Sequence, residues 1–137
     1  MRKYYFLDTN HLSHALGKVS TLRDRIRQGR RQGFRFGTCW PALFELEVGM
    51  SQTREPEVCR RNLKVLLKEV SIWAPDWKLM RGFGEVHHLL KQRGRILSHT
   101  DKVLAAMARI EKATLLTTDR DFEAIPEIKT ENWIANS

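Results

Sequence analysis

The sequence has few of the residues that build special classes of protein. Its 137 residues include only two cysteines, Cys39 and Cys59, which are too few for a disulfide scaffold and are not spaced like a metal clip. We expect both thiols to be reduced, with Cys39 in the core. No repeat is present, and no linker rich in proline, glycine or serine divides the chain. The sequence therefore predicts a single domain over residues 1–137.

Long apolar runs are also missing. No stretch approaches the roughly 18 apolar residues that indicate a membrane span. The apolar run at residues 4–7 ends at Asp8, too early for the core of a signal peptide. We therefore expect a cytoplasmic protein that does not enter a membrane.

Acidic residues are outnumbered. There are 24 lysines and arginines against 16 aspartates and glutamates, which gives a net charge of +8 and favours a polyanionic partner, either nucleic acid or an acidic protein. The excess is greatest between residues 23 and 35, where arginines face one acid, Asp24. Arginine suits bidentate phosphate contact, although a solvated helix face has the same composition. The candidates for RNA contact are Arg23, Arg27, Arg30 and Arg31.

What the chain does have is an alternation of short apolar runs and longer helical patterns. Strands are predicted over residues 4–7, 34–38, 71–73, 113–117 and 128–133. Helices are predicted over residues 9–14, 21–32, 41–50, 56–70, 76–93 and 100–108. Thr9 or Asn10 can cap the first helix, and Thr100 the last. Such an alternation indicates an α/β fold with a mainly parallel sheet.

Acidic residues follow two of the predicted strands. Asp8 comes directly after the first strand, and Asp119 comes just after the strand that ends at Thr117. In a parallel sheet the carboxyl ends of the strands share one edge, where functional groups gather. Asp101 lies in the first turn of the helix that leads into the second of these strands. The sequence therefore predicts that separate acids meet at one edge.

A fourth acid lies on the helix that begins near Pro41. Glu45 and Glu47 are two residues apart, so they point to different sides of this helix. We favour Glu45, because Gly49 lies on its face and leaves room for another element, a metal or a substrate.

Clustered carboxylates repel one another, and a hard cation between them relieves the repulsion. Mg²⁺ and Mn²⁺ prefer oxygen ligands, and a two-metal site can hold the attacking and leaving oxygens of a phosphodiester. A basic exterior with an acidic pocket therefore suits a metal-dependent nuclease. Each acid also has a plain structural interpretation as a cap, a turn residue or a solvated side chain.

Four segments resemble the motifs of a known family. Leu7-Asp8-Thr9-Asn10 is similar to the opening motif of PIN domains. Residues 45–49 (ELEVG) resemble the E-L-x-x-G stretch of VapC-type members, and residues 101–108 (DKVLAAMA) resemble their D-x-x-I-A-A-x-A helix. Residues 115–122 (LLTTDRDF) resemble the closing T-x-D-x-D-F motif. The order and spacing of these motifs span nearly the whole chain.

The resemblance implies a three-layer α/β/α PIN-like fold with a small, mainly parallel sheet. It also implies that Mg²⁺ or Mn²⁺ is held by catalytic acids at Asp8, Glu45, Asp101 and Asp119. Thr117 matches a supporting position, and Asp121 is the rival of Asp119 for the fourth acid. The implied activity is that of an endoribonuclease toxin that cleaves structured RNA, either tRNA or rRNA. The implied partners are a cognate VapB-like antitoxin and a second copy of the chain.

Two other functions compete with the nuclease. A non-catalytic PIN-like module would bind RNA or protein through its arginines. A metal-dependent phosphatase or phospho-acceptor domain also places an aspartate after its first strand, but such proteins usually have a second acid close to it, and Asp8 has none. His11 and His14 are expected at the surface or at the rim of the site. The four tryptophans are expected in the core or at a dimer interface, although they could stack on bases.

Overall fold

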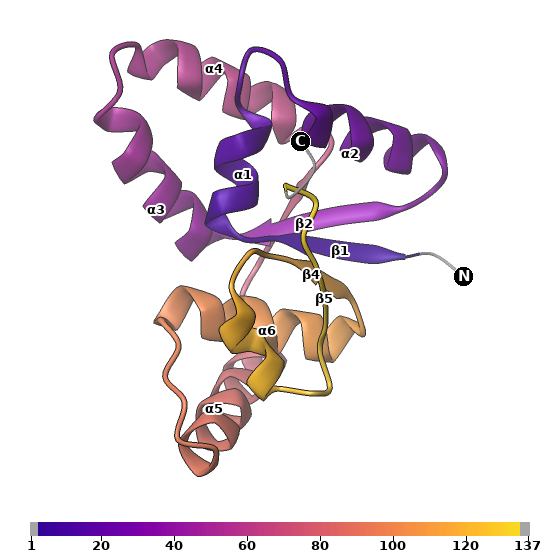
Figure 1. Cartoon of the computed structure of the whole chain (residues 1–137), viewed down its shortest axis with the longest axis vertical. Coiled ribbons are helices and arrows are strands. Elements are labelled where there is room, and N and C mark those ends of the chain that lie inside the picture. Colours follow the sequence, from indigo (N-terminus) through magenta and orange to yellow (C-terminus); the bar gives the residue numbers. More distant parts are fainter. Residues whose placement is uncertain (1–2, 135–137) are drawn as a thin grey trace.

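The computed structural model describes residues 3–134, and within them five short strands form one parallel sheet (Figure 1). The strand order is β3-β2-β1-β4-β5, and each neighbouring pair is parallel. The carboxyl ends of all five strands therefore lie at one edge. The strands are β1 (Tyr4–Leu7), β2 (Arg35–Cys39), β3 (Ser71–Trp73), β4 (Thr114–Leu116) and β5 (Lys129–Glu131).

Helices cover both faces of this sheet. Figure 1 shows α1 to α4 above the sheet and α5 and α6 below it, which confirms the predicted three-layer α/β/α arrangement. The helices are α1 (Thr9–Ala15), α2 (Thr21–Arg31), α3 (Trp40–Ser51), α4 (Pro56–Leu66), α5 (Trp77–Gln92) and α6 (His99–Glu111). A short 3₁₀ helix, η1 (Arg120–Ala124), follows β4.

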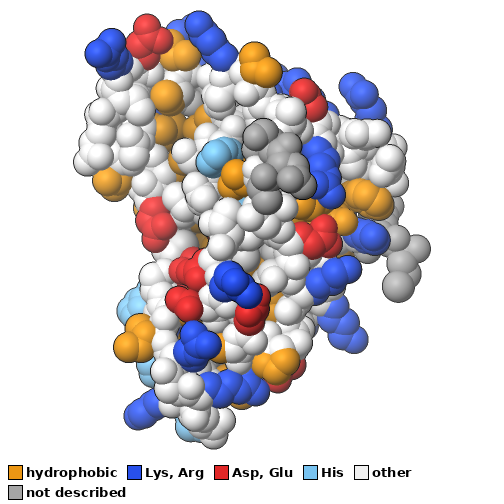
Figure 2. Space-filling view, viewed as in Figure 1, with side chains coloured by type: hydrophobic (Ala, Val, Ile, Leu, Met, Phe, Trp, Pro, Cys, Tyr) orange, Lys and Arg blue, Asp and Glu red, His pale blue; other side chains and the backbone are white. Residues whose placement is uncertain are grey.

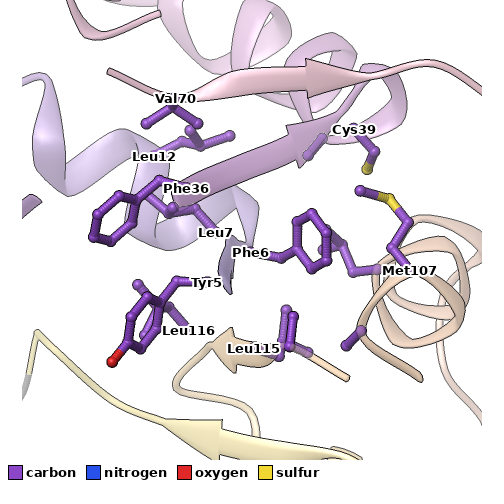
Figure 3. Close-up of a cluster of buried hydrophobic side chains, with 14 of the residues drawn as sticks. Tyr5, Phe6, Leu7, Leu12, Phe36, Cys39, Val70, Met107, Leu115 and Leu116 are labelled. Atoms are coloured by element: carbon purple, nitrogen blue, oxygen red, sulfur yellow. The ribbon is translucent and has the colours of Figure 1, made fainter. Parts of the chain in front are cut away.

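Strand β1 lies at the centre of the sheet and is buried on both faces. Figure 3 shows Tyr5 on the side of Phe36 and Leu116, whereas Phe6 points to the side of Met107. A strand with helices on both sides has no solvent face, so its sequence is a continuous apolar run rather than an alternating one. The burial of Tyr5, Phe6 and Leu7 in the core thus fixes the position of Asp8, the residue that follows β1.

Several helix limits differ from the predicted ones. Asp8 itself caps α1, because its carboxylate accepts the backbone N–H of His11, and Ser98 rather than Thr100 caps α6. Helix α4 ends at Leu66 instead of residue 70, and η1 was not predicted. Caps depend on the dihedral angles of one residue, which periodicity does not define.

Two other predictions can be checked in the described part of the chain. Cys39 is buried and unpaired, as expected, and Cys59 is also free. From residue 3 to residue 134, no helix combines the length and the apolar character needed to cross a membrane.

Candidate active site

Asp8 lies at the carboxyl end of β1 and is 7% exposed. Its backbone N–H donates to the carbonyl of Leu116, which extends the β1–β4 ladder by one residue and fixes the backbone beside β4. Its Oδ1 accepts the backbone N–H of His11 at 2.8 Å. Asp8 therefore follows the last residue of β1 and caps α1, so its side chain lies at the carboxyl edge of the sheet.

Glu45 is held toward this edge by a residue of α1. The Oγ1 atom of Thr9 donates to Oε1 of Glu45 at 2.9 Å, which joins α1 to α3 next to Asp8. Glu47 is engaged elsewhere, in an ion pair with Arg60 at 2.6 Å. No atom lies within 4 Å of the position that a Cβ on Gly49 would take. The space over Gly49, on the face of α3 that carries Glu45, is thus open.

Asp101 lies in the first turn of α6, two residues beyond its first residue His99. Burial raises the pKa of its carboxyl from an ordinary 3.8 to about 6. A hydrogen bond with Ser98 opposes this shift, and the charges of Asp119, Asp8 and Glu45 add to it. Asp101 therefore senses all three of the other predicted acids across the sheet edge.

Asp119 and Asp121 have different surroundings. The backbone N–H of Asp119 donates to Oγ1 of the buried Thr117 at 3.0 Å, and Oδ1 of Asp119 accepts the N–H of Asp121 at 2.8 Å. The carboxylate of Asp121 is exposed and pairs with Arg95 at 3.3 Å. Asp119 is also exposed, but its charge, and not that of Asp121, contributes to the raised pKa of Asp101. Asp119 is therefore the one on the side of the cluster, and Thr117 holds its backbone.

The four acids suit a hard divalent cation by their chemistry. Carboxylate oxygens are the ligands that Mg²⁺ and Mn²⁺ prefer. Burial is the main cause of the raised pKa of Asp101, and the charges of Asp119, Asp8 and Glu45 add a repulsion that a cation would relieve. Within residues 3–134, no three histidine, cysteine, aspartate or glutamate side chains are already gathered closely enough to hold one ion. Mg²⁺ usually keeps several of its waters, which fill the space between loosely placed carboxylates.

His11 was expected at the surface or rim, and this prediction is wrong. Its side chain is fully buried, whereas His14 is exposed as expected. The Nδ1 atom of His11 lies 3.0 Å from Oδ1 of Asp8. A usable signal was present in the sequence, because a residue three positions after a helix cap can reach back to that cap.

The predicted RNA-contacting arginines lie along α2, away from the acids. Helix α2 leads into the start of β2, so Arg30 and Arg31 lie toward the edge opposite the acids. The guanidinium of Arg23 donates to the carbonyls of residues 15, 17 and 18, so it serves the turn between α1 and α2. Arg30 has an exposed ion pair with Glu69 at 3.5 Å.

A basic pocket of about 320 Å³ lies between the end of α5 and the start of α6. We call it the α5–α6 pocket; its polar lining is His87, Lys91, Arg95 and Lys102. Lys102 is 7% exposed, and its ammonium donates to Nδ1 of His87 at 3.0 Å. Figure 2 shows acidic side chains gathered near the middle of one face, with lysines and arginines around them.

The fold and the cluster together define a parallel α/β domain with a carboxylate site at the ends of its strands. The family model described as "PIN domain" matches residues 5–128. The chain therefore belongs to the PIN-domain family, and its named relatives place it in the VapC branch.

Two of these relatives are similar over almost their whole length. Ribonuclease VapC2 of Rickettsia felis is 28% identical over 130 residues, which cover 94% of this chain and 97% of the relative. Ribonuclease VapC2 of Haemophilus influenzae is 31% identical over 134 residues, with 95% and 98% covered.

Solved structures show the same fold. A chain of VapBC2 from Rickettsia felis, bound to a DNA fragment from its promoter, matches with a TM-score of 0.82 and 27% identity. The match covers 95% of this chain and 98% of that one. A chain of DNA-bound VapBC from Salmonella typhimurium matches with a TM-score of 0.81 and 24% identity, over 97% and 99% of the two chains.

Proposed function

We propose that this protein is a metal-dependent endoribonuclease toxin of the VapC type, with Asp8, Glu45, Asp101 and Asp119 as its metal-holding acids. The observation that carries the proposal is that carboxylates from four separate segments meet at one sheet edge: burial raises the pKa of Asp101 to about 6, and the charges of Asp119, Asp8 and Glu45 all contribute to that rise. The names of the VapC ribonucleases that it resembles support the activity.

Each acid has a defined task in this proposal. Asp8 and Glu45 present carboxylate oxygens that are oriented by His11 and Thr9, respectively. Asp119 is held by its hydrogen bonds with Thr117 and Asp121, and Asp101 completes the set from α6. Mg²⁺ or Mn²⁺, when bound, supplies Lewis-acid stabilisation of charge on the phosphodiester and makes a water easier to deprotonate.

The proposed substrate is structured RNA, either tRNA or rRNA. The net positive charge supports an RNA partner. The α5–α6 pocket places positive charge near the acids, because Arg95 in its lining forms an ion pair with Asp121, two residues after Asp119. Arg27, Arg30 and Arg31 form a second, separate basic surface along α2. A folded RNA is large enough to contact both surfaces at once, whereas a short strand bound at the acids is not.

The proposed protein partners are a VapB-like antitoxin and a second copy of the chain. An apolar groove of about 390 Å³ runs between α3 and α5, and Trp40, Phe44 and Met80 on its walls are exposed. Contiguous apolar surface of this kind marks a protein interface more often than a solvated face. The similar Rickettsia felis protein was solved as VapBC2, which supports the antitoxin.

The test is cleavage of total tRNA and rRNA by purified protein, freed of any co-purified antitoxin, with Mn²⁺, Mg²⁺ or EDTA. Asp8→Asn should abolish cleavage and keep the fold, because asparagine is also a good helix cap and still accepts from His11. Asp24→Asn, an equal change on the exposed face of α2, is the control and should cleave normally. Full activity of Asp8→Asn would rule out its assigned role.

The same assay distinguishes the remaining possibilities. Asp119→Asn should lose far more activity than Asp121→Asn, because the carboxylate of Asp121 points to Arg95; the reverse order would make Asp121 the fourth acid. RNA retention without cleavage under every metal condition would favour the non-catalytic binding module.

A further inference from the structure

We propose that His11 is a positioning residue for Asp8, and that the backbone of the C-terminal segment locks its imidazole in one neutral tautomer. The inference rests on the proposed function, because it concerns how one of the metal-holding acids is oriented. Its starting point is that His11 is completely buried in α1 and that both of its ring nitrogens have hydrogen-bond partners.

The tautomer follows from the donor on one side of the ring. The backbone N–H of Trp133 can only donate, and it points to Nε2 of His11 at 3.2 Å. Nε2 therefore carries a lone pair, and the single ring proton must be on Nδ1. Nδ1 lies 3.0 Å from Oδ1 of Asp8, so the contact is a hydrogen bond from a neutral imidazole to the carboxylate.

This arrangement fixes the rotation of the Asp8 carboxyl group. Oδ1 receives two donors, the backbone N–H of His11 at 2.8 Å and its Nδ1–H at 3.0 Å. Both of these bonds go to the same oxygen, so Oδ2 is the oxygen left to meet a cation. Groups that hydrogen-bond to a ligating carboxylate fix its orientation and raise metal affinity.

The other end of the imidazole is anchored just as firmly. The indole of Trp133 packs on Tyr5, with ring centroids 4.9 Å apart, and the guanidinium of Arg25 lies 3.8 Å above the indole. The indole N–H donates to Glu131 at 2.9 Å. The segment after β5 thus sets the position of a side chain that orients an acid at the end of β1.

Two substitutions separate the two hydrogen bonds. In His11→Asn, the amide nitrogen takes the place of Nδ1 and can still donate to Asp8, but nothing reaches Trp133. In His11→Gln, the longer side chain can accept from Trp133 through its carbonyl, but it has no donor at the position of Nδ1. His11→Leu removes both bonds, and Asp8→Asn reports on the metal site itself.

The measurements are Mn²⁺ affinity by titration calorimetry and the free energy of unfolding without metal, on the full chain freed of antitoxin. We expect His11→Gln and His11→Leu to raise the Mn²⁺ dissociation constant by about 10–100-fold. His11→Asn should keep nearly normal affinity, although it is less stable because the Trp133 N–H has lost its acceptor.

A purely structural role would make Mn²⁺ affinity follow stability across the three variants. That result, or equal affinities of the asparagine and glutamine variants, would overturn the proposal. If instead Asp8→Asn binds Mn²⁺ as tightly as the unmodified protein, the metal site is wrong and the proposed function fails first. Asparagine and glutamine both keep a polar side chain, so their comparison stands even if His11→Leu does not fold.

Discussion

The Asp101 carboxyl lowers the stability of the folded protein when no cation is bound. Burial raises its pKa, and the charges of Asp119, Asp8 and Glu45 raise it further, to about 6. The unfolded chain has none of these neighbours and ionises near 3.8. Ionising Asp101 therefore costs more free energy in the metal-free folded state than in the unfolded state, which lowers the free energy of unfolding.

The sign of the resulting pH dependence is clear. The folded state holds this proton more tightly, so the contribution of Asp101 to stability is greatest below about pH 4 and is lost as the pH rises through about 6. In EDTA at pH 8, Asp101→Asn should raise the free energy of unfolding by about 1–2 kcal/mol, allowing for solvent screening, and should give no gain at pH 4. Denaturant titrations at both pH values check this. A gain that is equal at both values would contradict it, with Asp24→Asn as the control.

The sequence predicted that the acids lie at one edge of the sheet, as they do, but it placed His11 wrongly at the surface. Asp8 and Asp119 follow strands, so the geometry of parallel sheets brings them to one edge without further information. His11 is buried because Trp133, 122 residues later in the chain, offers it a backbone donor. No local pattern contains that partner, and only the spacing of three residues between Asp8 and His11 could be read from the sequence.

Among the elements, β3 places the side chain of Trp73 directly against Gly37 of the neighbouring strand β2. The indole of Trp73 lies over this glycine, and a Cβ added there would overlap the indole and come within 2.9 Å of Phe6. Trp73 also packs edge-on against Phe6, with ring centroids 5.4 Å apart, so the indole has little freedom to move. Because Gly37 has no side chain, the indole of Trp73 has room to pack against β2.

Gly37→Ala should therefore lower the free energy of unfolding by about 1–3 kcal/mol, the usual cost of overpacking a core. Gly49→Ala is the matched control, because its Cβ would meet open space on α3 and alanine favours a helix by about 0.5–1 kcal/mol. Chemical denaturation of both variants provides the comparison. A Gly37→Ala protein as stable as the unmodified one would show that Trp73 can move aside.

The elements themselves were largely predictable, since each predicted strand and helix has a counterpart between residues 3 and 134. Continuous apolar runs identified the buried strands, and helical spacing identified the longer segments. The 3₁₀ helix η1 was missed because five residues are too few to show a period. Its start depends on the Asp119 side chain, which accepts the N–H of Asp121.

Across the whole molecule, the basic residues proposed to contact RNA lie in two separate places. The α5–α6 pocket is beside the acids, whereas Arg30 and Arg31 are toward the opposite edge of the sheet. The alternation of elements already contained this fact, because a helix that leads into a parallel strand ends where that strand begins. The sequence does not show how far apart the α5–α6 pocket and the arginines of α2 are, and so how long an RNA must be to contact both.

Binding of a long and a short RNA should therefore distinguish the contributions of these two basic surfaces. In the cleavage-inactive Asp8→Asn background, we expect the double change Lys91→Gln and Arg95→Gln to weaken binding of both a full tRNA and a short oligonucleotide that fills only the acidic site. The double change Arg30→Gln and Arg31→Gln should weaken binding of the tRNA alone, because a short strand does not reach the far edge.

Fluorescence anisotropy at several NaCl concentrations measures both effects. Each lost phosphate contact should reduce the slope of log K against log salt by about one. The double change Lys64→Gln and Lys68→Gln removes the same charge from exposed positions on α4 and in the turn that follows it, and should change neither RNA's affinity as much. Equal losses from all three pairs would mean that net charge alone attracts the RNA, and an unchanged tRNA affinity without Arg30 and Arg31 would confine the RNA to the edge that carries the acids.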